Sequence, residues 1–266
     1  HNERGGKWEE NPEVCIKLIR TIGDINTKDE NFAFHYPSDI AFDDAGNIYI
    51  LDTGNHRIQK FSPEGKYIAT IGRKGQGPGD FYFPSSLDID SRGYLSVLEP
   101  FQRRIQVLTP EGKERKTIRL RLSELHKIRF LKSGIIATGG FIDFIYTSTE
   151  DKKDKSFSKL INLIDLEGNV QKEFGDIYEY DDKFVKTEKN RFHFDVGKED
   201  NIYLSFAHQN LIEKYSTDGR ILWKADRALN YSIEPQGKAR IETKGGSINF
   251  QLPKMNKCSN GIAVDE

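Results

Sequence analysis

Two acid–base pairs occupy matching positions of the chain and are the first candidates for a polar site. Asp52 precedes Arg57 by five residues, and Glu99 precedes Arg104 by the same spacing. A repeated pair of this kind either binds a polar ligand or forms an ion pair that holds its own loop together. We favour the ion pair, because opposite charges this close in one loop attract each other. Arg57 and Arg104 remain candidates for ligand binding.

The residues directly before these arginines are His56 and Arg103. Both belong to the same two loops and are therefore further binding candidates. Because one is an imidazole and the other a guanidinium, the sequence indicates no shared ligand chemistry for this position.

Three more polar residues, Asp39, Ser86 and His193, fall at equivalent places in three similar segments. A metal site there would need several carboxylates or imidazoles. The set is mixed, and a further copy of the segment carries Gly261 at that place. The sequence therefore predicts no bound metal and no other cofactor, and the three residues are candidates for ligand binding. No Ser-His-Asp or Cys-His grouping indicates a catalytic site.

Charge and hydropathy argue against two classes of protein. The 40 Lys and Arg residues and the 41 Asp and Glu residues leave a net charge of -1 over 266 residues, which argues against a dedicated nucleic-acid binder. No stretch approaches about 18 apolar residues, so no membrane span is expected. The 17 Phe and 11 Tyr residues supply material for a folded core.

The two cysteines, Cys15 and Cys258, are too few for a disulfide scaffold. Either both are free thiols, which we favour, or they form one long-range disulfide in a secreted protein.

An internal repeat indicates the elements that must position all these residues. Residues 36–52 align with residues 83–99 at an offset of 47, and weaker copies follow further along the chain. Each copy contains short alternating strands separated by Gly-Asn or Pro-Glu-Gly-Lys turns. Four antiparallel strands per unit, at this period, are typical of one blade of a β-propeller.

The predicted fold is therefore all-β, a single propeller domain of four-stranded antiparallel blades. The blades are expected at residues 34–72, 81–120, 126–175 and 190–225. An inserted hairpin at 141–159 interrupts the third blade, and a second insertion with an extra strand pair occupies 226–250. The glycine-rich loop at 73–80 is interpreted as a blade connection, because a strand rather than a helix follows it.

The two ends are expected to be strands without a complete blade. Residues 14–23 form the predicted closing strand, and residues 251–266 begin a further blade at 261–265. Strand edges of this kind need partners. Either a longer chain supplies the missing blades, which we favour, or further copies of this protein exchange strands with it.

Apolar residues that recur with a period of two are predicted to be buried between blades. They are Phe42, Ile48, Ile50, Ile58, Phe61, Ile89, Leu95, Val97, Ile105 and Val107.

Residues 34–120 resemble NHL repeats, through the stretch Gly-Asn-His-Arg-Ile-Gln-Lys-Phe at 54–61. Residues 71–81 and 259–265 are similar to secreted bacterial six-bladed propellers of that superfamily. The resemblance implies a six-bladed ring, of which about four and a half blades are present here. It also implies a secreted protein, extracellular or periplasmic.

Two functions are consistent with these observations. The favoured hypothesis is a non-catalytic binding or structural scaffold for a protein, a glycan or further copies of itself. The alternative is a metal-dependent lyase or lactonase-type enzyme with its site on the central axis, as in some propeller relatives. The mixed axial residues favour the scaffold.

Overall fold

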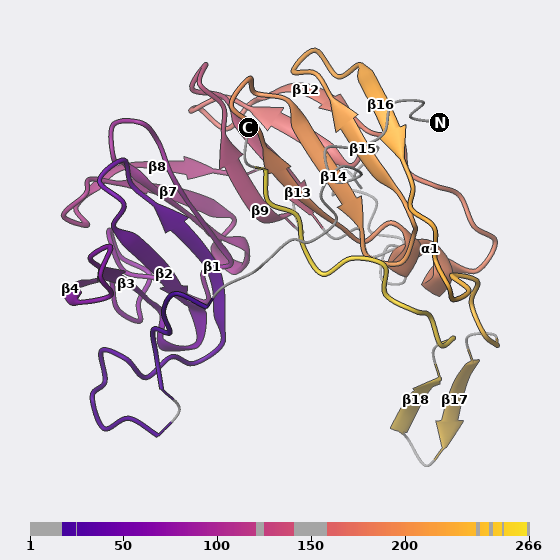
Figure 1. Cartoon of the computed structure of the whole chain (residues 1–266), viewed down its shortest axis with the longest axis horizontal. Coiled ribbons are helices and arrows are strands. Elements are labelled where there is room, and N and C mark those ends of the chain that lie inside the picture. The colour runs from indigo at the N-terminus through magenta and orange to yellow at the C-terminus, as the bar shows by residue number, and fades with distance from the viewer. Residues whose placement is uncertain are drawn as a thin grey trace.

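The computed structural model describes residues 18–24, 26–120, 125–140, 159–237, 240–244, 247–251 and 253–264. These residues form four antiparallel sheets of four strands each and one separate two-stranded hairpin. The four sheets are the blades of a β-propeller and follow one another along an arc (Figure 1).

Blade one contains β1 (Pro37–Phe42), β2 (Ile48–Asp52), β3 (Arg57–Phe61) and β4 (Tyr67–Ile71). Blade two contains β5 (Ser86–Ile89), β6 (Leu95–Glu99), β7 (Arg104–Leu108) and β8 (Glu114–Arg119). Blade three contains β9 (Leu125–Phe130), β10 (Ile136–Gly140), β11 (Ile161–Ile164) and β12 (Val170–Phe174). Blade four contains β13 (Phe192–Val196), β14 (Ile202–Phe206), β15 (Ile212–Tyr215) and β16 (Ile221–Ala225). Within each blade the strands pair in chain order.

Repeated turns explain why these segments fold into hairpins. The Asp43 carboxylate accepts a hydrogen bond from the Asn47 backbone N–H, and Gly46 adopts a φ of 78° in the turn between them. The same Asp-x-x-Gly turn recurs at Asp90 and Gly93, where φ is 80°. Glycine adopts this conformation without steric cost, so the motif specifies the β1–β2 and β5–β6 hairpins.

Apolar side chains fill the spaces between successive blades. Leu51 and Ile58 of blade one pack with Leu87 and Val97 of blade two, and all four are fully buried. A second cluster continues from blade two through blades three and four. Burying one such side chain contributes about 1.5–3 kcal/mol, so the interfaces between blades form the core.

Six of the ten predicted core residues are buried: Ile58, Phe61, Leu95, Val97, Ile105 and Val107. Ile48, Ile50 and Ile89 are half-buried. The prediction is wrong for Phe42, whose side chain is 58% exposed. Successive strand residues point to opposite faces, and Ala41 packs toward blade two. Phe42 therefore lies on the other face of β1, against which no blade packs in the part of the chain that the structure describes.

Two elements lie outside the blades. A short helix that the sequence analysis did not expect, α1 (Lys183–Lys189), precedes blade four, and Asp182 caps its N-terminus. The hairpin of β17 (Arg240–Lys244) and β18 (Ser247–Gln251) covers the end of the second predicted insertion and extends one residue beyond it. It stands apart from the blades in Figure 1. No helix among the described residues is long and apolar enough to cross a membrane.

The predicted end strands are described in part. Residues 18–23 form no strand, and residues 14–17 lie outside the described residues. Residues 261–264 also form no strand, but the Val264 backbone N–H donates to the Asp195 carboxylate of β13 at 3.1 Å. This C-terminal segment therefore lies against blade four.

Two further predictions concern residues that are not described. The predicted insertion in blade three lies outside the described residues from 141 to 158, and so does Cys15. Cys258 is a buried free cysteine.

Candidate ligand site on the propeller axis

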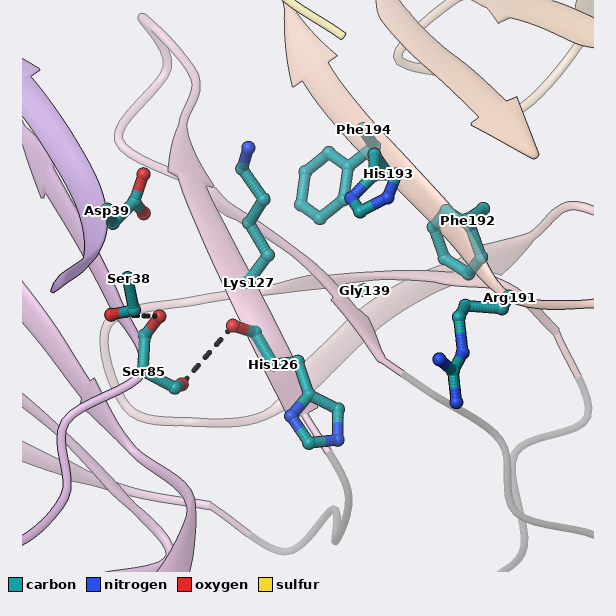
Figure 2. A pocket seen from close by; sticks show the side chains of 10 residues that line it. All are labelled: Ser38, Asp39, Ser85, His126, Lys127, Gly139, Arg191, Phe192, His193 and Phe194. Atoms are coloured by element: carbon teal, nitrogen blue, oxygen red, sulfur yellow. Dashed lines mark hydrogen bonds between the residues drawn. The ribbon is translucent and has the colours of Figure 1, made fainter. Parts of the chain in front are cut away.

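A cavity of about 410 Å³ opens where the first strands of the four blades meet. Ten residues line this axial pocket: Ser38, Asp39, Ser85, His126, Lys127, Gly139, Arg191, Phe192, His193 and Phe194. Ser38 Oγ donates to the Ser85 carbonyl at 3.3 Å, and Ser85 Oγ donates to the His126 carbonyl at 3.2 Å (Figure 2). The pocket wall is thus joined from blade to blade.

Hydrogen bonds between neighbouring first strands identify the equivalent positions. Asp39 Oδ2 accepts the Leu87 backbone N–H at 3.1 Å, and Ser86 Oγ accepts the Ile128 backbone N–H at 3.2 Å. Leu87 directly follows Ser86, and Ile128 directly follows Lys127, so each acceptor bonds one residue past its equivalent in the next blade. Asp39, Ser86 and Lys127 are therefore equivalent residues of blades one, two and three.

Lys127 is the member of this set that the sequence analysis missed. The third repeat unit is recognisable only from Phe130, the last residue of β9, so its first strand carried no repeat signal. Of the predicted set, Asp39 and His193 line the axial pocket, whereas Ser86 lies behind it and donates to Asp39 at 2.8 Å. Gly261 does not line it.

An arginine that the sequence analysis also missed joins three blades behind the pocket. Arg129 Nε of β9 donates to Asp195 Oδ1 of blade four at 3.0 Å, and Arg129 Nη1 lies 3.3 Å from Asp39 Oδ2 of blade one. Burial alone would raise the pKa of Asp39, but the Arg129 guanidinium and the Ser86 hydroxyl outweigh it and lower that pKa. Asp39 is therefore an ionised partner of Arg129.

A second axial carboxyl, Asp88 of β5, has a different character. Burial raises the pKa of Asp88 to about 6, although Arg129 and the Phe130 backbone N–H favour the ionised form. The hydrogen bond from Phe130 is 2.6 Å long. Asp88 thus keeps its proton to a higher pH than an ordinary carboxyl group does.

Basic side chains outnumber acidic ones on the pocket wall. Burial lowers the pKa of Lys127. Burial also lowers the pKa of His193, and the nearby Lys127 and Arg191 lower it further. The pKa of His126 is lowered by burial and by Arg191. Asp39 is the one acidic residue among the ten that line the pocket, so the wall favours an anion.

The carboxylates of Asp39, Asp195 and Asp88 attract the Lys127 ammonium without touching it. It forms no hydrogen bond or ion pair with the residues that the structure describes, and Figure 2 shows it projecting between Asp39 and His193. Arg191, by contrast, pairs with Glu188 at 2.9 Å. Phe192 and Phe194 of β13 add an apolar side to the pocket, so the geometry suits an acidic group attached to a less polar body.

The basic side chains on the axis also disfavour a bound metal ion. Over the described ranges, no three His, Cys, Asp or Glu side chains gather closely enough to hold a metal ion. Arg129 and Lys127 lie beside the axial carboxylates and would repel a second cation there.

The two predicted ion pairs are present. Arg57 Nε lies 2.9 Å from Asp52 Oδ2, and Arg104 Nε lies 2.7 Å from Glu99 Oε2. Both carboxylates are fully buried. The ion-pair interpretation is confirmed, and the two arginines are not among the residues that line the axial pocket.

Each of these arginines also holds the loop that enters its blade. Arg104 donates to the carbonyls of Gln76 and Asp80, and Arg57 donates in the same way to two carbonyls of the preceding loop. The loop at 73–80 is therefore bound to blade two, as a blade connection would be.

His56 and Arg103 end matching turns in the left-handed conformation, with φ of 57° and 47°. His56 is buried, and its Nδ1 accepts the Phe83 backbone N–H at 3.0 Å. Burial lowers the pKa of His56, and Lys74 lowers it further, which favours this neutral acceptor. His56 thus joins blade one to blade two, while Arg103 is exposed. Neither residue lines the axial pocket.

The four-stranded blades and the repeat that encodes them agree with the family to which the chain is similar. The family described as a 6-bladed β-propeller matches residues 24–221, and the chain belongs to it. No curated protein matches the chain.

Solved structures are similar to the chain at low sequence identity. A protein described as exported, from Bacteroides fragilis, has a TM-score of 0.57 at 16% identity, with 73% of this chain and 51% of that chain covered. A catalytically inactive variant of virginiamycin B lyase from Staphylococcus aureus, solved with quinupristin, has a TM-score of 0.51 at 12% identity, with 81% and 69% covered. These similarities show the fold alone, and the chain spans about half the length of the Bacteroides protein.

Proposed function

We propose that this chain is a non-catalytic binding scaffold whose axial pocket receives an anionic group of the ligand. The observation that carries the proposal is the Lys127 ammonium, which points into the pocket without a hydrogen-bond or ion-pair partner among the described residues. A desolvated cation of this kind gains more from an anionic ligand than an exposed lysine does.

The neighbouring side chains support the same ligand chemistry. Arg191 adds positive charge, His193 adds an imidazole whose lowered pKa favours the neutral form, and Ser38 adds a hydroxyl. The partly buried ring of Phe192 offers an apolar surface beside these groups. A small organic anion, or an acidic group of a larger ligand, fits this combination.

We further propose that the protein acts outside the cytoplasm, in the extracellular or periplasmic space. The support is the similarity of residues 71–81 and 259–265 to secreted bacterial six-bladed propellers. The fold similarity to a protein described as exported adds to it.

The alternative, a metal-dependent lyase or lactonase-type enzyme, has one supporting observation. The fold is similar to that of virginiamycin B lyase at 12% identity. Arg129 and Lys127 on the axis weigh against it, because a catalytic metal would have to bind beside two cations.

The proposal is tested by isothermal titration calorimetry with glucuronate, benzoate and citrate, each compared with a neutral analogue. We expect at least one anion to bind, and Lys127→Met to weaken it about tenfold to a hundredfold, the loss of one charged hydrogen bond. Lys132→Met is the matched control, because Lys132 is exposed just beyond the opposite end of β9. Anion binding that survives Lys127→Met, or no binding at all, would overturn the proposal.

A further inference from the structure

Three aromatic side chains stand exposed on the segments that lead into β1 and β5 and that link β6 to β7. The side chains of Tyr36, Phe83 and Phe101 are 76%, 40% and 75% exposed. Tyr36 and Phe83 lie two residues before Ser38 and Ser85, which line the pocket. We call these three side chains the aromatic rim.

The backbone holds two of the rim residues in a costly conformation. Tyr36 has a φ of 52° and Phe83 a φ of 48°, in the left-handed region that bulky residues rarely adopt. Each also precedes a proline, which further disfavours helical backbone angles at this position. The two residues occupy the same place in the repeat. Strain that recurs at one position of a repeat points to a function for that position.

Buried carboxylates hold this strained backbone in place. Asp52 Oδ1 accepts the His35 backbone N–H at 2.7 Å, and Glu99 Oε1 accepts the Tyr82 backbone N–H at 2.8 Å. In each blade the donor is the residue directly before the rim aromatic. The ion pairs of Asp52 and Glu99 therefore position the rim as well as the loops.

Ring contacts add to this rigidity. The Phe83 and Phe101 centroids are 6.1 Å apart, and the His56 ring lies edge-on to Phe83 at 4.5 Å. Rings that are fixed before binding lose little conformational entropy when a ligand lies on them.

The chemistry of the rim favours a sugar over a protein. The exposed Ile, Leu and Val side chains of the described residues lie outside the rim, on β1, β4, β12 and β16 or at 18–19. The hydroxyls of Ser38, which lines the pocket, and Thr53 are 2.6 Å apart, and Thr53 donates to the carbonyl of Pro84, the residue after Phe83. Flat rings next to hydroxyls match the C–H faces and hydroxyl groups of a pyranose.

We infer that the ligand is an acidic saccharide, an inference that rests on the proposed function of the axial pocket. Its carboxylate or sulfate group enters the pocket toward Lys127, and the adjoining sugar rings lie on Phe83 and Phe101. The positive pocket wall supplies the charge complementarity, and the rim supplies the stacking surface.

The test is an array of oligosaccharides that carry uronate, sulfate or sialic acid groups, with neutral oligosaccharides and triglutamate as comparisons. We expect the protein to capture acidic oligosaccharides but neither neutral oligosaccharides nor triglutamate. The double variant Phe83→Ala, Phe101→Ala should weaken the captured oligosaccharide about tenfold or more. It should leave binding of the matching acidic monosaccharide within about twofold, because the monosaccharide reaches only the pocket. Phe42→Ala is the matched control, since Phe42 is exposed on the flank of β1.

The outcomes separate the two proposals. If small anions bind through Lys127 but no acidic oligosaccharide is captured, the saccharide inference is overturned and the proposed function stands. Capture of triglutamate with the same dependence on Phe83 and Phe101 also overturns it, in favour of an acidic peptide. If Lys127→Met has no effect on any anion, both proposals fail.

Discussion

At the scale of single residues, buried charge holds the loops that lead into blades one and two. The Glu99 carboxylate is fully buried and accepts hydrogen bonds from Arg104, Gln106 and the Tyr82 backbone. Its negative charge is thus stabilised by one cation and several dipoles. Removing the cation leaves the carboxylate without compensation in a medium of low dielectric constant.

We therefore predict that Arg104→Met lowers the free energy of unfolding by about 3–5 kcal/mol, measured by urea denaturation. The control is Arg73→Met, because Arg73 forms its ion pair with Asp80 while remaining 83% exposed. That variant should change the free energy of unfolding by less than about 1 kcal/mol. Equal losses in the two variants would contradict the assigned role of Arg104.

A second residue-scale prediction concerns Asp88, whose pKa burial raises to about 6 from an ordinary 3.8. The folded protein therefore binds a proton between these pH values that the unfolded chain does not. This contribution to stability is fully present below about pH 4 and is lost as the pH rises through 6.

Asp88→Asn removes this titration. The stability of the variant relative to the wild type should rise by on the order of 2–3 kcal/mol between pH 4 and pH 7. Denaturation curves of both proteins across this range measure the difference, and parallel pH profiles would contradict the raised pKa.

At the scale of elements, the tight turns show how surroundings change the cost of one substitution. Gly134 and Gly168 both adopt a positive φ, 81° and 83°. A Cβ on Gly134 would meet nothing within 4 Å, whereas a Cβ on Gly168 would lie 2.5 Å from the Arg119 carbonyl oxygen of blade two.

We predict that Gly134→Ala costs about 1–2 kcal/mol, the price of the left-handed conformation alone. Gly168→Ala should cost at least about 1 kcal/mol more, because the turn must move away from blade two. Thermal unfolding of the two variants measures the cost of the backbone conformation and the added cost of the contact with blade two. Equal destabilisation would show that blade three does not approach blade two as described.

The same turns explain how much of the fold was predictable. Blades one and two carry the Asp-x-x-Gly turns and the repeated arginines in clear copies, so the sequence predicted their strands and ion pairs. The first strand of blade three, with Lys127 and Arg129, had no recognisable copy. Helix α1 has only seven residues, too few for a helical period to be recognised in the sequence.

At the scale of the whole molecule, the site depends on how blades face one another. A period of two predicts that Phe42 and Val97 each have a buried face, but the neighbouring blade decides which face is covered. Val97 packs between blades, while Phe42 is exposed. The sequence analysis placed Asp39 and His193 near the axis, but the hydrogen-bond register was needed to add Lys127.

The most direct test of the central claim, that the axial pocket is an anion site, is to locate a bound anion. Crystals of the protein soaked in selenate should show an anomalous scattering peak within hydrogen-bond distance of Lys127 Nζ. Crystals of Lys127→Met should lack that peak while keeping the Arg129 network with Asp39 and Asp195 intact. A pocket that stays free of selenate in the wild-type protein, or a peak that is unchanged in Lys127→Met, would contradict the claim.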